Sequence, residues 1–236
     1  MTVPGAEYLS LPFTEAIAFL RKKISLTTEA WDDIWGAMHL RAFTVAGATN
    51  EALLEDLRQA VDKAIATGTT LADFRKNFDA IIDKSGWSYN GSRGWRTAVI
   101  YDTNLSVAYA AGRFRQMSSP EVKAVRPYLR YVRSSSAERR PEHESWAGLV
   151  LPQDDPFWDT HMPPNGWGCK CGVVSVSRIG LERLRAEGAD IRTKAPAVDL
   201  VEYVDKKTGR VTEIPRGIDP GWDYHPGKDP WPEGKS

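Results

Sequence analysis

Residues 140–171 read RPEHESWAGLVLPQDDPFWDTHMPPNGWGCKC, and this stretch decides how the second half of the chain folds. Asp155-Pro156 and Pro163-Pro164-Asn165-Gly166 are turn sequences, because proline fixes φ and Asn-Gly accepts a positive φ. Phe157, Trp158 and Trp167 supply aromatic rings that pack over such turns. The stretch therefore predicts a turn-dominated segment with a packed interior, and no long helix.

Metal-ligating side chains are concentrated in the same stretch, at His143, His161, Cys169 and Cys171. Thiolates and imidazoles bind zinc, and two of each would complete a tetrahedral shell. The C-x-C spacing is tighter than that of common zinc modules, but two thiolates separated by one residue can still reach one ion. One interpretation is therefore a zinc site, with His143, Cys169 and Cys171 as the leading ligands and His161 as a further candidate.

Two other interpretations fit these residues. His143 beside Asp154 or Asp155 matches a general base with an orienting carboxylate, but no nucleophile elbow, phosphate loop or H-E-x-x-H pattern accompanies it. In the structural interpretation, Cys169 and Cys171 are buried thiols on one face of a strand, and His143 hydrogen-bonds a loop carbonyl. The residues favour the structural interpretation and leave the other two open.

The composition excludes several classes of protein. The chain has 236 residues, 42% of them hydrophobic, which is enough for one large domain or two small ones. No stretch approaches the ~20 apolar residues that cross a bilayer, and the N-terminus does not have the pattern of a secretory signal. The two cysteines are one residue apart, so a disulfide framework is excluded and folding in a reducing cytoplasm is expected.

The net charge of the chain is zero, because Lys+Arg and Asp+Glu both total 31, so a general affinity for nucleic acid is not indicated. A local basic segment holds Arg126, Arg130, Arg133, Arg139 and Arg140. Contact of Arg126, Arg130 and Arg133 with DNA phosphates is the functional interpretation. A solvated, salt-bridged surface is the alternative, and the balanced charge favours it.

The first half of the chain has helical periodicity. Apolar residues recur every three or four positions within 13–24, 28–43, 50–68, 70–86 and about 95–117. Residues that cap helices open several of these segments, and glycine ends two of them. We expect a helical bundle to about residue 118, in which the Trp31 and Trp35 stripe packs into the core.

The second half is predicted to contain short strands. Residues 128–133 and 172–177 have strand character, 179–188 resembles a short helix, and 199–215 reads as a β-hairpin that turns at Lys207, Thr208 and Gly209. The tail from residue 221 is rich in Gly and Pro, and His225 is expected at its surface. The fold class is therefore α+β, with a helical region at 1–118 and a loop-rich region at 119–236.

The 140–171 pattern closely resembles the signature of the phage Mu F-like head morphogenesis family. The helix motif Tyr101-x-Thr103-Asn104-x-x-x-Ala108-Tyr109-x-Ala111-Gly112-Arg113 and the segments 39–46 and 217–224 resemble the family as well. The signature positions include Asp154, Asp155, Trp158, Asn165 and Trp167. Many family members extend well past the Asp-Pro-Gly-Trp-Asp segment, whereas this chain ends soon after it.

The resemblance implies a minor head protein that acts structurally in capsid assembly, near the portal or inside the head. The implied partners are portal, capsid or scaffold proteins, with DNA second and with neither a membrane nor a small-molecule substrate. Its location would be the host cytoplasm during assembly and then the virion head. The alternative is a metal-dependent hydrolase or nuclease built on His143, Asp154, Asp155 and His161, and this resemblance does not favour an enzyme.

Overall fold

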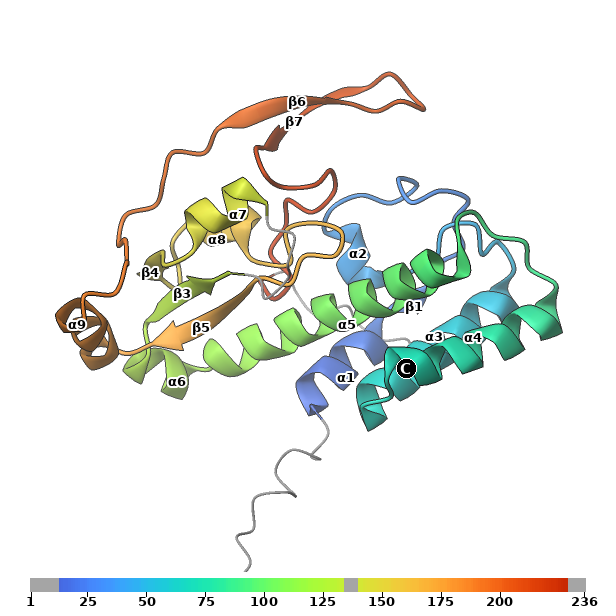
Figure 1. The fold of residues 1–236 in the computed structure, drawn as a ribbon, viewed down its shortest axis with the longest axis horizontal. Coiled ribbons are helices and arrows are strands. Elements are labelled where there is room, and N and C mark those ends of the chain that lie inside the picture. Colours follow the sequence, from blue (N-terminus) through green and yellow to red (C-terminus); the bar gives the residue numbers. More distant parts are fainter. Residues whose placement is uncertain (1–12, 134–139, 229–236) are drawn as a thin grey trace, which may run out of the picture. The chain divides into compact units, whose positions relative to one another are not determined.

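The computed structural model describes residues 13–133 and 140–228 (Figure 1). These residues form two compact units. The first contains residues 13–33 and 39–112, and the second contains residues 34–38 and 113–228. The mixture of helices, which dominate the first half, and short strands confirms the α+β class. No helix among the described residues has the length and apolar character that a membrane span requires.

The first unit is mainly helical, and its sequence explains where its helices begin and end. Asn50 accepts a hydrogen bond from Leu53 N at 3.0 Å and caps one helix, and Thr70 caps the next in the same way. Both helices end at a glycine with positive φ, Gly68 and Gly86. The elements are α1 (Thr14–Lys22), β1 (Ile24–Ser25), β2 (Ala42–Phe43), α3 (Glu51–Thr67), α4 (Leu71–Ser85) and α5 (Arg93–Met117), whose last residues belong to the second unit.

The apolar periodicity of α3 and α4 becomes the core of this unit. Leu54, Leu57 and Val61 of α3 are almost fully buried, as are Phe74 and Phe78 of α4. Such faces supply most of the stability of helices in a bundle, because each helix alone is marginal in water. The helices predicted at 13–24, 50–68, 70–86 and 95–117 are confirmed.

The helix predicted at 28–43 is wrong. This segment consists of turns, followed by the single helical turn α2 (Met38–Arg41) and the strand β2, which pairs in parallel with β1. Asp33 accepts hydrogen bonds from the backbone N–H groups of Glu29 and Ala30, which fixes a turn, and Gly36 has a φ of 52°. Trp31 and Met38 remain 38% and 52% exposed, so the expected stripe is not a core face.

The second unit is built on a three-stranded antiparallel sheet with the order β4-β3-β5. In β3, Leu129 and Tyr131 are buried and alternate with less buried neighbours, as the period of a strand requires. The elements are α6 (Pro120–Val125), β3 (Tyr128–Val132), α7 (Pro141–Trp146), β4 (Val150–Pro152), α8 (Phe157–His161), β5 (Gly172–Val176), α9 (Arg178–Ala186), β6 (Leu200–Val204) and β7 (Val211–Pro215).

The predicted strands at 128–133 and 172–177, the helix at 179–188 and the hairpin at 199–215 are confirmed. Asp205 shapes the hairpin turn, because its carboxylate accepts hydrogen bonds from Lys207 N and Thr208 N. Gly209 has a φ of 71°, which few other residues adopt. Figure 1 shows β6 and β7 as a long ribbon separate from the three-stranded sheet.

The tail has no regular structure in its described part, as expected, but it is not a surface segment. Trp222, Tyr224 and His225 are all less than 9% exposed, so the prediction of a surface His225 is wrong. Its Nδ1 accepts hydrogen bonds from Gly227 N at 3.0 Å and Lys228 N at 2.9 Å. These bonds close a turn that holds the imidazole in the interior.

Candidate functional site

The candidate site begins with His143, which α7 places in the interior of the second unit. Pro141 occupies the first turn of this short helix, where the missing N–H is not needed. His143 is 5% exposed, and its ring stacks on Trp146 with centroids 5.0 Å apart. Its Nε2 lies 2.8 Å from Gly217 O. A carbonyl only accepts, so Nε2 carries the proton and Nδ1 presents a lone pair in the neutral ring.

Two sulfur atoms face that lone pair. The Nδ1 atom of His143 lies 3.7 Å from Cys169 Sγ and 3.6 Å from Cys171 Sγ. The three ligand atoms all lie within 4.8 Å of one another, and among the described residues no other group of three or more such side chains gathers in this way. Lys170 between the cysteines is exposed, because alternate residues of an extended segment face opposite sides.

The pKa values of these groups reflect their mutual contacts. The hydrogen bond with Cys171, together with burial, raises the pKa of the Cys169 thiol to about 12. Burial lowers the pKa of His143, but the hydrogen bonds with Cys169 and with Gly217 O outweigh it, so the net pKa is raised. A metal ion would therefore have to displace at least one thiol proton at neutral pH.

A bidentate ion pair joins the start of this segment to the tail of the unit. The Arg140 guanidinium donates from Nη1 to Asp219 Oδ1 and from Nη2 to Asp219 Oδ2, both at 2.9 Å. Trp167 contributes its carbonyl to Arg140 and its N–H to Asp219. A Cβ on Gly166 would overlap both charged groups, so a larger residue at this position would have to displace the ion pair. We call Arg140, Gly166, Trp167 and Asp219 the brace.

A second connection joins the sheet to the Asn-Gly turn. The Tyr131 hydroxyl donates to Asn165 Oδ1 at 2.9 Å, and both residues are almost fully buried. The carbonyl of Asn165 accepts from Asp219 N at 3.1 Å. Three segments that are distant in the sequence therefore meet around the turn of residues 163–169. The 140–171 stretch contains no long helix, as predicted, but the short elements α7, β4 and α8 occupy part of it.

The remaining signature residues have local partners. Asp155 accepts from Phe157 N at 3.0 Å at the start of α8, and Asp154 forms an exposed ion pair with Lys123 at 2.7 Å. The buried Trp158 donates to Pro152 O. Among the described residues, neither aspartate belongs to the ligand cluster of His143, so the proposed general base is not assembled there.

His161 is buried but lies outside the cluster of three ligand atoms. Its ring stacks on Phe157 with centroids 4.2 Å apart, and its Nδ1 lies 2.8 Å from Thr160 Oγ1. Burial lowers its pKa to about 4, with His143 adding a smaller repulsion. His161 is thus a neutral, packed histidine beside the cluster.

The arginines of the basic segment do not form a single free patch. Arg126 donates to the side chain and the carbonyl of Ser175, and Arg133 lies 3.8 Å from Glu144. Arg130 lies on β3 opposite Val150 and Val174, on the less buried face of the strand. Arg139 lies outside the described residues.

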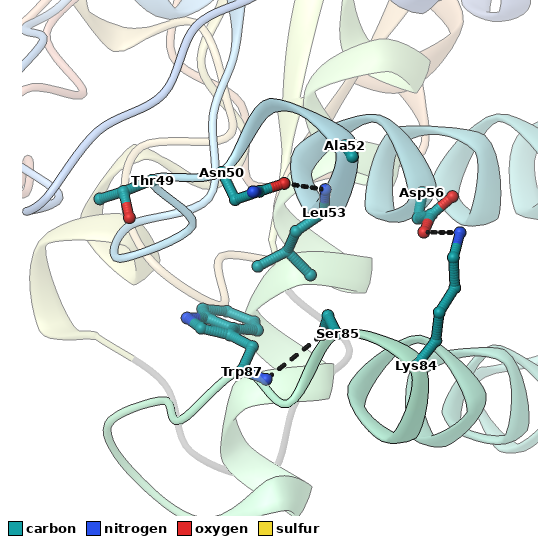
Figure 2. Close-up of a pocket in the computed structure, with 8 residues that line it drawn as sticks. All are labelled: Thr49, Asn50, Ala52, Leu53, Asp56, Lys84, Ser85 and Trp87. Carbon is teal, nitrogen blue, oxygen red and sulfur yellow. Dashed lines mark hydrogen bonds and ion pairs between the residues drawn. The ribbon is translucent and has the colours of Figure 1, made fainter.

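A hollow of about 290 Å³ in the first unit is unrelated to this cluster (Figure 2). Three of its polar side chains already have partners: Lys84 pairs with Asp56 at 2.6 Å, and Asn50 accepts a hydrogen bond from Leu53 N. Trp87 covers one side and donates to Gly47 O. Its lining contains no histidine or cysteine, and its one carboxylate, Asp56, is paired with Lys84.

No local sequence pattern pointed to Gly217, Asp219 or Tyr131 as parts of the site. Arg140 and Asp219 are 79 positions apart, and no local pattern pairs residues at that distance. Asp219 lies in one of the segments that carry the family resemblance, which was the available signal.

Comparisons with known proteins agree with that resemblance. The family model described as Phage Mu protein F like protein matches residues 55–174, just over half of the chain. A protein of Escherichia phage Mu named for capsid assembly, protein F, is 32% identical over 96% of this chain and 56% of its own length. The Mu-like prophage FluMu F protein of Haemophilus influenzae is 31% identical over 84% of this chain and 52% of its own length.

The chain spans about half the length of the curated relatives it matches. No solved structure matches it. The match to the family model covers the whole 140–171 segment, with the turn and both cysteines, and it also covers α4, α5 and most of α3. The chain therefore belongs to the Phage Mu protein F like family.

Proposed function

We propose that this chain acts structurally in phage head assembly, where it holds neighbouring head proteins in place. The names of its relatives support this role, since one of them is named for capsid assembly. The proposed partners are portal, capsid or scaffold proteins, and the proposed location is the head near the portal. The observation that carries the proposal is the use of the polar groups of the 140–171 segment as internal connections.

These connections leave few groups for chemistry on a substrate. Arg140 and Asp219 neutralise each other, and His143 is tied to the Gly217 carbonyl. Asp155 accepts a hydrogen bond from Phe157 N at the start of α8, and Asp154 lies apart on the surface. A hydrolase or nuclease needs such groups gathered around one reacting atom. Apart from the cluster of His143, Cys169 and Cys171, the described residues do not gather such groups, so we favour a scaffold over an enzyme.

The hairpin offers a surface for a partner. Leu200, Val204 and Val211 are 49%, 52% and 56% exposed on one face of β6 and β7. On the same face, Glu202 lies directly opposite Glu213, and both are exposed. Like charges opposite each other destabilise a sheet. We propose that this face binds a head protein that presents a lysine or arginine between aliphatic side chains, because such a cation would relieve the repulsion.

Complementation tests the general role. The coding sequence is deleted from the phage or prophage genome that carries it and supplied again in trans, and heads are counted by electron microscopy. We expect few normal heads without the protein and recovery with the wild-type chain. Normal numbers of normal heads in the deletion would overturn the proposal, and so would turnover of a phosphodiester or peptide substrate by the purified protein that is lost in Asp155→Asn.

A charge reversal tests the contact surface. We expect Glu202→Arg to reduce the amount of this protein in purified heads at least tenfold, because it would repel the proposed cation. Glu121→Arg is the matched control, since it reverses the charge of an exposed glutamate outside the hairpin. Equal incorporation of Glu202→Arg and wild type would show that another surface makes the contact, while leaving the general role intact.

A further inference from the structure

The cluster of His143, Cys169 and Cys171 has the dimensions of a zinc site. Tetrahedral zinc binds sulfur at about 2.3 Å and nitrogen at about 2.0–2.1 Å, so a nitrogen and a sulfur on one ion lie about 3.6 Å apart. The two nitrogen–sulfur distances in the structure are 3.6 Å and 3.7 Å. An ion could therefore enter between these atoms with only small side-chain movements.

The orientation of His143 is a second, independent indication. Its Nε2 donates to Gly217 O, so the neutral ring turns its other nitrogen, with a lone pair, toward the sulfurs. Histidines that bind metals almost always donate their second ring N–H to a carbonyl, carboxylate or water in this way. Only one of the two thiols can donate a hydrogen bond to the single lone pair of Nδ1, whereas a metal ion binds both sulfurs and the nitrogen at once.

The surroundings also fix the ligands before an ion arrives. Trp146 stacks on the imidazole, and Cys169 N donates to Gly166 O at 3.1 Å within the braced turn. His143 and Cys169 are buried, whereas Cys171 is only partly buried and Lys170 is exposed. The cluster is thus rigid on its inner side and reachable by solvent on its outer side.

We propose that His143 Nδ1, Cys169 Sγ and Cys171 Sγ bind one zinc ion, with a water molecule as the fourth ligand. Two sulfur ligands select a soft or borderline metal and disfavour calcium and magnesium. The ion joins α7 to the chain before β5 and, through His143, to the Gly217 segment. The ion would cross-link loops that contain little regular structure, and its water-bearing fourth position is the open arrangement that catalytic zinc sites also have.

Metal analysis of purified full-length protein tests the site directly. The protein is prepared without a histidine tag, and zinc, iron, copper and nickel are measured per chain. We expect one zinc per chain in wild type, loss of that zinc in Cys171→Ser and in His143→Gln, and retention in Lys170→Ala. Lys170→Ala is the matched control because it changes the same loop between the two ligands.

Cobalt substitution keeps the test valid if the ligand variants fold poorly. Wild-type protein is stripped of metal, refilled with Co²⁺ and measured by absorption spectroscopy. We expect intense visible bands typical of a tetrahedral ion and a near-ultraviolet thiolate band, both abolished by competing Zn²⁺. Wild-type protein that holds no metal and binds neither ion, or a cobalt spectrum without thiolate bands, would overturn the proposal.

The fourth ligand has its own test. We expect His161→Gln to retain zinc and the tetrahedral cobalt spectrum, because His161 lies outside the group of three ligand atoms. Loss of zinc from a folded His161→Gln protein would show that His161, and not water, completes the shell. Circular dichroism establishes whether that variant is folded.

Discussion

The ion pair between Arg140 and Asp219 should stabilise the second unit far more than a comparable pair on the surface. Asp219 accepts two hydrogen bonds from Arg140 and one from Trp167 N. Replacing Asp219 with alanine removes all three, and it leaves the guanidinium beside a partly buried turn. We therefore expect the free energy of unfolding to fall.

The magnitude follows from the environment of the pair. Hydrogen bonds to charged groups contribute about 1.5–3 kcal/mol each, and exposed ion pairs as a whole about 0.2–1 kcal/mol. The Arg140 and Asp219 side chains are 37% and 27% exposed, so the pair lies between these limits. We expect Asp219→Ala to cost about 2–4 kcal/mol, and the coupling between the two charges to be about 1.5–2.5 kcal/mol.

The chain contains a control of the same geometry. Arg21 and Asp62 also form a bidentate pair, at 2.7 Å and 2.9 Å, but the Arg21 side chain is 60% exposed. Double-mutant cycles with alanine at each pair, measured by urea unfolding, give the two coupling energies directly. We expect the Arg21–Asp62 coupling to be below about 1 kcal/mol.

The comparison has a clear negative outcome. If the Arg140–Asp219 coupling is within about 0.5 kcal/mol of zero, or no larger than that of Arg21–Asp62, the pair does not brace the turn. Unchanged m-values in all variants are required for this conclusion, since a change would mean that the unfolding transition itself had altered.

Three further predictions concern the same unit. Gly166→Ala should lower the free energy of unfolding in urea by at least about 2 kcal/mol, because its Cβ would overlap the ion pair. Gly172→Ala is the control and should leave that free energy nearly unchanged, because a Cβ there meets no other atom. Equal effects of the two substitutions would refute the close approach at Gly166. Burial lowers the pKa of His225 to about 3, so the protonation of this residue in the unfolded chain below pH 6.5 should by itself contribute about 2 kcal/mol of destabilisation between pH 7 and pH 5. This loss should shrink in His225→Asn, whose side chain can still accept the turn hydrogen bonds, and an identical acid profile in that variant would contradict the assignment. Replacing Arg130 and Arg133 with alanine should leave DNA affinity and its salt dependence unchanged in filter binding, and a marked fall in both would support a DNA contact.

Local signals explain why most of the helices were predictable. In α3 and α4, the capping residue, the apolar period and the terminal glycine all agree, and each acts within a few residues. The segment 28–43 has the same period, but Asp33 competes by accepting backbone hydrogen bonds in a turn. Apolar periodicity could not reveal that competition, because the turn depends on hydrogen bonds from nearby backbone N–H groups to the side chain of Asp33.

The candidate site was predictable in part. Residue type alone pointed to His143, Cys169 and Cys171, and the structure places these side chains together. The same reasoning included His161, Asp154 and Asp155 because they are close in sequence. Turns carry the two aspartates to other surroundings and leave His161 beside the cluster, and the partners that position His143 and Arg140 come from the tail. Such long-range pairings form only in the folded backbone, so the local spacing of residues in the sequence does not predict them.

Electron cryomicroscopy of purified heads tests the central claim most directly. If the chain is a structural part of the head, density that fits its two units should appear in contact with portal or shell proteins, and mass spectrometry should find the chain in the same particles. Complete heads that contain neither the density nor the chain would contradict a structural role.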